Sequence, residues 1–302
     1  MNTNRVSERQ GHLWLAASMA APLAKAASGC SWPAVLAMGA VTLLIERWLT
    51  RYRAEPKPWQ EILQSLWASV VISEMLHWCG ECWPTSGDAR GASLILLALC
   101  IWLACKGRSV TARAGCTLIW PVGLLLGLIL LSAATEIKAE NLMPIWQMPC
   151  AHLVTVLLIT TLYTGRGEKR SGGVSVGLIC FSLAVSVITA GVLSNHVSDG
   201  AGLYELSRSI SFFGVSQRLE SVAAVGMTLG YFGGIGYLLS IPEETANRSR
   251  MVLAYGALAG LLFLANIRFD SRIIAIGSVL IWVVLPSICS VKNIFQKTQN
   301  ST

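Results

Sequence analysis

Apolar residues gather along this chain into long runs separated by short polar segments. Ten of these runs are long enough, or nearly so, to cross a bilayer as a helix, for which about 20 apolar residues suffice. They occupy residues 12–29, 33–50, 59–83, 91–105, 115–135, 142–164, 173–194, 217–241, 251–267 and 273–291. The pattern predicts an all-α, polytopic membrane protein with a single transmembrane domain over residues 1–302, because no connecting segment is long enough to hold a soluble domain.

Composition agrees with this class. The chain is 54% hydrophobic and only 13% charged, whereas soluble domains carry about 25% charged residues. A net charge of +7 would suggest a nucleic-acid partner in a soluble protein, but here it is needed for cytoplasmic loops, so no nucleic-acid binding is inferred. The nine cysteines lie mostly inside apolar runs, which is typical of small side chains facing neighbouring helices.

The basic residues indicate an orientation. With both termini in the cytoplasm, 16 of the 23 Lys and Arg residues fall in inner segments and six in outer ones. This is the bias that the positive-inside rule predicts for a cytoplasmic-type, or inner, membrane. The N-terminus also resembles a signal peptide whose removal would leave nine spans, but Pro22 and Lys25 fit its cleavage site poorly, so we expect the segment to be retained.

The ten spans can be divided into two repeats of five, over about residues 12–135 and 142–291. The first and sixth spans then run in opposite directions, as an inverted-repeat transporter requires. Such folds place a small-molecule site near the bilayer midplane, where the first helix of each repeat is interrupted.

Both of these spans contain helix breakers. Pro22 and Gly29 interrupt the first, with Lys25 between them, and Pro144 and Pro149 interrupt the sixth, with Gln147 between them. Backbone groups freed by such breaks can hold a small polar ligand, so Pro22, Lys25, Pro144 and Gln147 are candidate substrate contacts. The alternative is that the prolines are ordinary, since the fifth and tenth spans contain one each.

Span three carries Glu74, His77 and Glu81 on one helical face. Intramembrane carboxylates are costly and usually functional, which favours a proton or cation relay in which Glu74 and His77 share a proton. The alternative places His77 and Glu81 near the solvated interface and leaves Glu74 bonded to another helix. Lys25 could fix a ligand carboxylate, pair with an acid such as Glu74, or extend to the surface.

The same helix end contains Cys79 and Cys82 in a C-x-x-C arrangement. A redox pair would need a thioredoxin-like context and a metal site a second cluster, and neither is present in the sequence. No H-E-x-x-H, G-x-S-x-G or paired-Asp motif occurs either, so an enzyme is the least favoured class and no cofactor or metal is predicted.

Residues 203–218 form a polar, amphipathic run that leads into the eighth span. Arg218 and Glu220 lie at this junction, on the outer side of the predicted topology. An outer arginine opposes the positive-inside bias, so we expect the two residues to form local ion pairs that serve as an extracellular gate or a partner surface.

Three segments resemble the endospore germination permeases, the B subunits of spore germinant receptors. The segments are residues 7–39 with their mid-helix proline, the run Asn141-Leu142-Met143-Pro144-Ile145, and residues 203–241 with Tyr204, Arg208, Gln217-Arg218 and Glu220-Ser221. The resemblance implies a ten-helix LeuT-like fold of the amino acid, polyamine and organocation superfamily. It also implies binding or transport of a small nutrient such as an amino acid, and assembly with other receptor subunits in a membrane of a spore-forming bacterium.

In that family the ligand approaches the segment before the proline of helix one, which here is Met19, Ala20 and Ala21. Members usually carry a glycine pair there, and this chain is also shorter between spans three and five. Two alternatives therefore stay open: a structural or assembly subunit with a decayed ligand site, and a generic proton-coupled amino acid permease.

Overall fold

The computed structural model describes residues 7–51, 58–83, 89–142, 150–164, 172–193, 202–209, 219–242 and 247–289. Every regular element in these ranges is helical. The α-helices are α1 Glu8–Ser28, α2 Trp32–Arg51, α3 Pro58–Glu81, α4 Ala89–Cys105, α5 Arg108–Ala134, α6 Ala151–Thr164, α7 Gly172–Leu193, α8 Gly202–Ser209, α9 Leu219–Leu239, α10 Arg248–Leu264 and α11 Ser271–Val279. A 3₁₀ turn precedes α6 at Ala139–Leu142, and a π-helical segment extends α11 over Leu280–Val284.

Each predicted span overlaps one long α-helix, and α8 is the short helix of the amphipathic run before the eighth span. Within the described ranges, α2, α5, α7, α9 and the α11 region are long and apolar enough to cross a membrane, and α4 and α6 are shorter apolar helices. The part of the chain that the structure describes is thus all-helical, and its long apolar helices are those of a multi-pass membrane protein.

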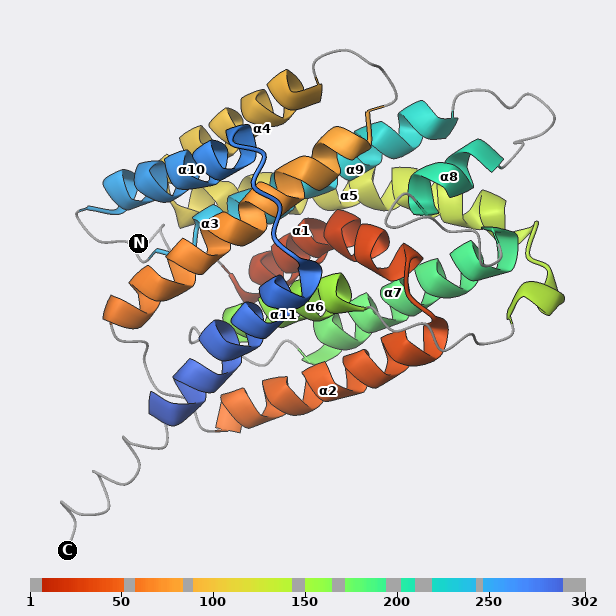
Figure 1. Cartoon of the computed structure of the whole chain (residues 1–302), viewed down its shortest axis with the longest axis horizontal. Helices are drawn as coiled ribbons and strands as arrows, with labels where there is room; N and C mark the ends of the chain where they lie inside the picture. Colours follow the sequence, from red (N-terminus) through yellow and green to blue (C-terminus); the bar gives the residue numbers. More distant parts are fainter. Residues whose placement is uncertain are drawn as a thin grey trace, which may run out of the picture.

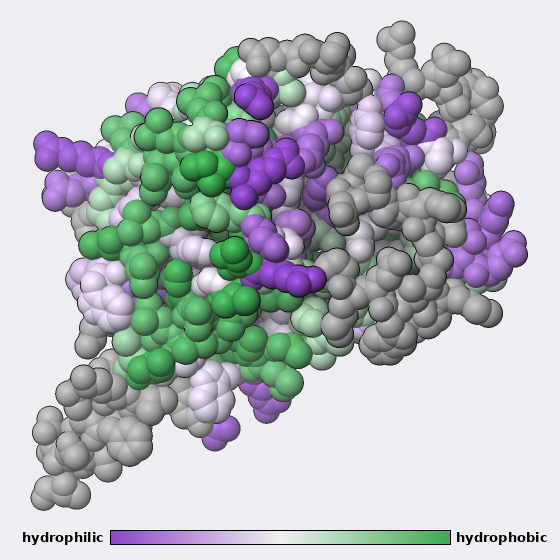
Figure 2. Space-filling view, viewed as in Figure 1, coloured by the Kyte–Doolittle hydropathy of each residue, from purple (hydrophilic) through white to green (hydrophobic). Residues whose placement is uncertain are grey.

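Helix α1 lies in the middle of the molecule (Figure 1). It packs against α9, α5, α7 and α6, while α2 packs on α6 and α7, and α3 on α10 and α9. On the face shown in Figure 2, apolar side chains form a broad band and hydrophilic ones gather toward its sides. This distribution suits a bundle whose flank meets lipid and whose helix ends meet water.

Local signals explain where two helices begin. The Ser7 hydroxyl accepts the Gln10 amide while the Gln10 side chain accepts the Ser7 amide, forming a capping box at the start of α1. Asp270 accepts the Arg272 amide at 2.8 Å and caps α11.

Glycines on α9 let α1 approach unusually closely. A Cβ added to Gly230 would overlap the Cβ of Ala21, and one added to Gly234 would lie 2.9 Å from the Ser18 carbonyl oxygen. Gly233 faces the Ser18 backbone in the same way, at 3.3 Å from its Cα. We call this contact of Gly230, Gly233 and Gly234 with α1 the glycine seam.

The predicted break at Pro22 is wrong, because α1 runs without interruption from Glu8 to Ser28, whereas the helix does end at Gly29. Pro22 has no amide to bond the Ser18 carbonyl, four residues earlier. Gly234 approaches that carbonyl instead, and the Pro22 ring lies 3.5 Å from the Cβ position of Gly234. The close partner helix therefore covers the defect. The break predicted around Pro144 and Gln147 lies outside the described residues.

Candidate functional site

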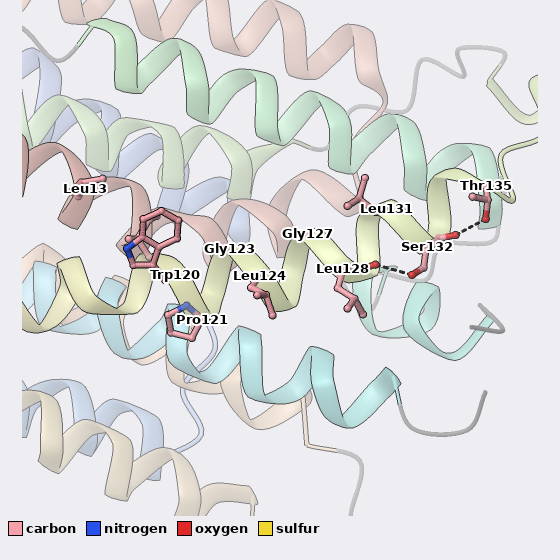
Figure 3. A pocket seen from close by; sticks show the side chains of 11 residues that line it. Leu13, Trp120, Pro121, Gly123, Leu124, Gly127, Leu128, Leu131, Ser132 and Thr135 are labelled. Carbon is pink, nitrogen blue, oxygen red and sulfur yellow. Dashed lines mark hydrogen bonds between the residues drawn. The ribbon is translucent and has the colours of Figure 1, made fainter. Parts of the chain in front are cut away.

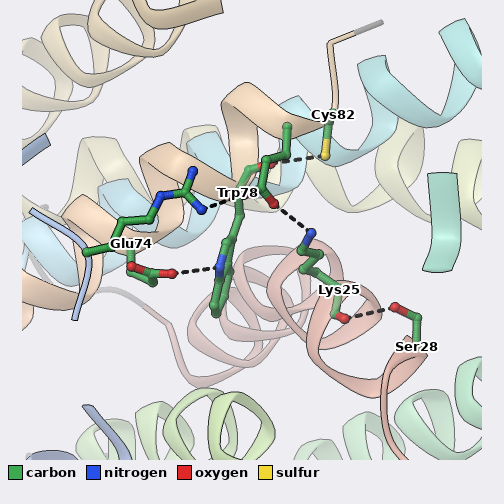
Figure 4. A network of polar contacts seen from close by, with 7 residues as sticks. Lys25, Ser28, Glu74, Trp78 and Cys82 are labelled. Carbon is green, nitrogen blue, oxygen red and sulfur yellow. Dashed lines mark hydrogen bonds and ion pairs between the residues drawn. The ribbon is translucent and has the colours of Figure 1, made fainter. Parts of the chain in front are cut away.

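Lys25 lies in the last turn of α1 and is 91% shielded from solvent, because only 9% of its side chain is exposed. Its Nζ donates to Oε2 of Glu81, the last residue of α3, at 2.8 Å (Figure 4). The Ser28 hydroxyl donates to the Lys25 carbonyl at 2.9 Å and completes the final turn. Of the partners considered from the sequence, Lys25 thus takes neither Glu74 nor the surface but Glu81.

The other oxygen of Glu81 is also occupied. Arg268, in the connection between α10 and α11, donates from Nη1 to Glu81 Oε1 at 3.0 Å. The side chains of Glu81 and Arg268 are 38% and 55% exposed. We call Lys25, Glu81 and Arg268 the Lys25 cluster; it joins three separate parts of the chain and carries one net positive charge.

Stability does not account for this cluster. A half-exposed ion pair such as Glu81 with Arg268 contributes about 0–1 kcal/mol. Removing the ammonium of Lys25 from water costs on the order of several kcal/mol, which a single well-placed carboxylate offsets only in part. Because charges buried in membrane proteins are expensive, they usually mark a pathway or a ligand site.

A small pocket adjoins the cluster. It has a volume of about 30 Å³, enough for one water molecule but not for an amino acid. Its lining consists of Lys25, Glu81, Cys82, Leu203, Tyr204, Ala223, Ala224 and Met227. Leu203 and Tyr204 belong to α8, so this short helix covers the pocket, and the alanines of α9 leave the space within it.

α8 is attached to α9 through Glu220. The Tyr204 hydroxyl donates to Glu220 Oε2 at 3.3 Å, and Arg208 Nε lies 3.6 Å from the same oxygen. Burial and the Glu220 carboxylate raise the pKa of Tyr204 above its ordinary value, so the phenol keeps its proton and remains a donor. Glu220 thus forms a local ion pair, with Arg208; Arg218 lies outside the described residues.

The structure does not bring Glu74 and His77 into contact. Trp78 Nε1 donates to Glu74 Oε1 at 3.1 Å within α3 (Figure 4). His77 instead packs on the Phe263 ring at 4.7 Å between centroids, and its buried Nε2 has no hydrogen-bond partner in the described part of the chain. The structure thus gives Glu74 and His77 separate neighbours, and their sharing of a proton stays a prediction. The Trp78 ring also meets His152 of α6 edge-on, at 4.9 Å.

The expected ligand segment of α1 is packed shut. Met19 and Ala21 are fully buried, Pro22 is buried against the glycine seam, and Ala20 is half-buried. Neither of the two pockets described in this section is lined by these residues. The buried charged group of α1 lies about one turn after Pro22, at Lys25.

Cys79 and Cys82 are both buried, and Cys82 donates to the Trp78 carbonyl at 3.3 Å. Among the described residues, no group of three or more His, Cys, Asp or Glu side chains is placed to hold a metal ion. The C-x-x-C motif therefore has no further ligand beside it in this part of the chain.

A second pocket differs from the one at the Lys25 cluster in its size and in its apolar lining. It is an open groove of about 1210 Å³ along the outer face of α5, lined almost wholly by apolar groups (Figure 3). Trp120, Leu124 and Leu131 are largely exposed on it, and nothing lies within 4 Å of a Cβ added at Gly123 or Gly127. This face is suited to lipid or to another membrane helix, not to a polar solute.

Sequence reasoning missed Arg268, Arg208 and Trp78 as members of the polar network. The first two carried a signal in the sequence, because the predicted topology places both on the outer side, against the positive-inside bias. In the structure each of them pairs with a glutamate. No protein-family model matches this chain, and no curated protein matches it significantly.

Proposed function

We propose that the chain is a transporter-like membrane subunit that binds a small zwitterionic nutrient, entering by the Lys25 cluster. The observation that carries the proposal is the buried Lys25, paired with Glu81 beside a pocket that α8 covers. A zwitterionic ligand can take the place of either partner: its carboxylate can pair with Lys25, and its ammonium group can pair with Glu81. The resemblance to germination permeases gives the same ligand class and a receptor-subunit role.

The helix packing supports an inverted repeat of five and five, with α8 inserted. If α1–α5 correspond to α6, α7, α9, α10 and α11, equivalent contacts should occur in pairs. The packing of α1 on α5 matches that of α6 on α11, α1 on α7 matches α6 on α2, and α3 on α10 matches α9 on α4, whereas the extensive packing of α1 on α9 has no counterpart of similar extent between α6 and α3. Such pairing is expected of two repeats related by an axis in the membrane plane.

The proposed orientation keeps both termini in the cytoplasm. Successive long helices alternate in direction in Figure 1, so their connections gather at two ends of the molecule. The described basic residues Arg51, Arg108 and Arg248 start or finish helices at one end, and the Lys25 cluster lies at the other. We assign the first end to the cytoplasm because it carries more positive charge.

Binding can be tested with the full-length protein in lipid nanodiscs and a panel of amino acids, sugars and nucleosides. We expect an amino acid to raise the melting temperature of the wild type, and Lys25→Met to weaken its binding at least tenfold. Lys138→Met is the matched control, since Lys138 is exposed and belongs to no ion pair in the described structure. Folded wild-type protein that binds none of these compounds would contradict the proposal.

One observation favours the assembly-subunit alternative. Helix α9 packs closely against the Met19–Pro22 segment, and the pocket at Lys25 has a volume of only about 30 Å³. An assembly subunit would keep this closed state under all conditions. Co-purification of partner subunits with a chain that binds no nutrient would support that reading over the first.

A further inference from the structure

The charges of the Lys25 cluster do not balance. Lys25 and Arg268 supply two positive charges, and the Glu81 carboxylate bonds to both of them. Glu81 Oε2 lies 2.8 Å from Lys25 Nζ, and Glu81 Oε1 lies 3.0 Å from Arg268 Nη1. One carboxylate is thus held between an ammonium group from α1 and a guanidinium group from the connection between α10 and α11, and one positive charge is left over.

Two other acids in the described ranges belong to separate contacts. Glu220 pairs with Arg208 at 3.6 Å and accepts the Tyr204 hydroxyl through the same oxygen. Glu74 accepts from Trp78 and does not line the pocket. Neither acid forms an ion pair with the two cations of the Lys25 cluster, so the positive charge beside the pocket is available to a ligand.

The net charge of a ligand decides whether it neutralises the cluster. A neutral zwitterion adds no net charge, so the excess positive charge stays beside a buried ammonium group, which is costly in a membrane protein. An acidic amino acid has two carboxylates and one ammonium group, the reverse of the two cations and one carboxylate of the cluster. Each charge of such a ligand therefore has an opposite charge to meet in the protein.

We infer that the nutrient is an acidic amino acid, such as aspartate or glutamate, that displaces the Glu81 carboxylate from between Lys25 and Arg268. One ligand carboxylate pairs with Lys25, the other pairs with Arg268, and the ligand ammonium group pairs with Glu81. The planar guanidinium group of an arginine suits a carboxylate because it can donate two parallel hydrogen bonds to it. This inference names the ligand class of the proposed site and so rests on the proposed function.

The positions of the three residues allow the exchange. Glu81 is the last residue of α3 and 38% of its side chain is exposed, so its carboxylate can turn without disturbing the helix. Arg268 lies between two helices and is 55% exposed, whereas Lys25 is held in the last turn of α1. The pocket must enlarge to admit the ligand, and movement of α8, which covers it with Leu203 and Tyr204, provides the room.

Matched ligands test the charge of the nutrient. Glutamate and glutamine have the same size and differ by one charge, as do aspartate and asparagine. Isothermal titration calorimetry measures their binding to the full-length protein in nanodiscs, and we expect each acid to bind at least about tenfold more tightly than its amide. Glutarate has both carboxylates but no ammonium group, so it should bind at least about tenfold more weakly than glutamate, because Glu81 is left unpaired.

Variants of the connection between α10 and α11 test the assignment of the second carboxylate. Arg268→Gln should lower the affinity for glutamate to that for glutamine and leave the affinity for glutamine unchanged. Arg268→Lys keeps the charge and should keep the preference for the acid. Arg272→Gln, at an exposed position in the first turn of α11, is the matched control and should bind as the wild type does. The melting temperature of each variant without ligand shows that it is folded.

The outcomes separate this inference from the proposed function. Any other amino acid that binds as tightly as glutamate and aspartate, or an Arg268→Gln variant that keeps the preference, would overturn the inference while the proposed function stands. Glutarate that binds as tightly as glutamate would overturn the pairing of the ligand ammonium group with Glu81. Folded protein that binds no amino acid would overturn both.

Discussion

Two regions of α1 are built in opposite ways. At the glycine seam, the helix is pressed against α9 with backbone nearly touching backbone and no charged group present. About one turn later, at the Lys25 cluster, the same helix buries an ammonium group, adjoins a pocket and is joined to other elements by ion pairs. Close packing has few alternative arrangements, whereas ion pairs can exchange one partner for another. The seam is therefore suited to hold the fold, and the cluster to open.

The largest expected effect comes from disturbing the seam. Gly230→Ala places a methyl group where it overlaps the Ala21 Cβ, and we expect a loss of about 1–3 kcal/mol of stability from overpacking. Thermal unfolding in detergent and the yield of monodisperse protein measure it.

The matched control is Gly123→Ala on the open face of α5, where nothing lies within 4 Å of the new methyl group. Alanine is the better helix former, so this variant should be unchanged or up to about 1 kcal/mol more stable. Equal stability of the two variants would remove the distinction between the seam and the lipid-facing surface.

Breaking the Lys25 cluster should have the next largest effect. Glu81→Gln leaves the Lys25 ammonium buried without its counter-charge, and we expect a loss of about 2 kcal/mol, less than for a fully buried pair because Glu81 is 38% exposed. Adding Lys25→Met should recover much of this loss. Glu136→Gln, at an exposed position, serves as the control; a double variant that is no more stable than Glu81→Gln would show that the two charges are not coupled.

Trp78→Phe tests how much the hydrogen bond from Trp78 to Glu74 contributes to stability. It removes the indole N–H that bonds Glu74 and leaves a mostly buried carboxyl group without its donor, which should cost about 1–2 kcal/mol. The melting temperature measures the loss. If Glu74→Leu, which removes the acceptor, suffers the same loss and the double variant loses no more, the bond accounts for the effect; additive losses would assign it to packing of the ring.

The helix positions, the Lys25–Glu81 pair and the continuity of α1 differ in how far the sequence alone predicts them. The positions of the helices could be read from the sequence, because an apolar run of sufficient length has few other uses in a membrane protein. Lys25 and Glu81 could each be singled out as costly charges, but their pairing depends on how α1 and α3 both pack on α9. The continuity of α1 through Pro22 could not be foreseen, since Gly234, more than 200 positions away, supplies the cover.

The relay expected on span three shows a different limit. A spacing of three residues places Glu74 and His77 on one face, but spacing does not choose rotamers. Trp78, one turn after Glu74, offers a donor that captures the carboxylate, and Phe263 provides an apolar surface for the imidazole. The side-chain positions of Glu74 and His77 are therefore set by neighbouring residues of α3 and α10, which the spacing along the sequence does not reveal.

The smallest effect is expected at α8. Tyr204→Phe removes one hydrogen bond to Glu220, worth about 0.5–1 kcal/mol, so global stability should change little. Local opening of α8 should increase, because this short helix is attached to α9 by few polar contacts. Hydrogen exchange over Gly202–Ser209 measures it, and exchange equal to the wild type would show that Tyr204 does not hold the cover.

Hydrogen–deuterium exchange of the wild-type protein in nanodiscs, with and without a mixture of the standard amino acids, tests the central claim most directly. If nutrient enters by the Lys25 cluster while the seam stays closed, exchange should change in α8 and at the end of α3, and remain slow and unchanged across Gly230–Gly234 of α9. Exchange that is unchanged in α8 and α3 while the seam responds would contradict the account.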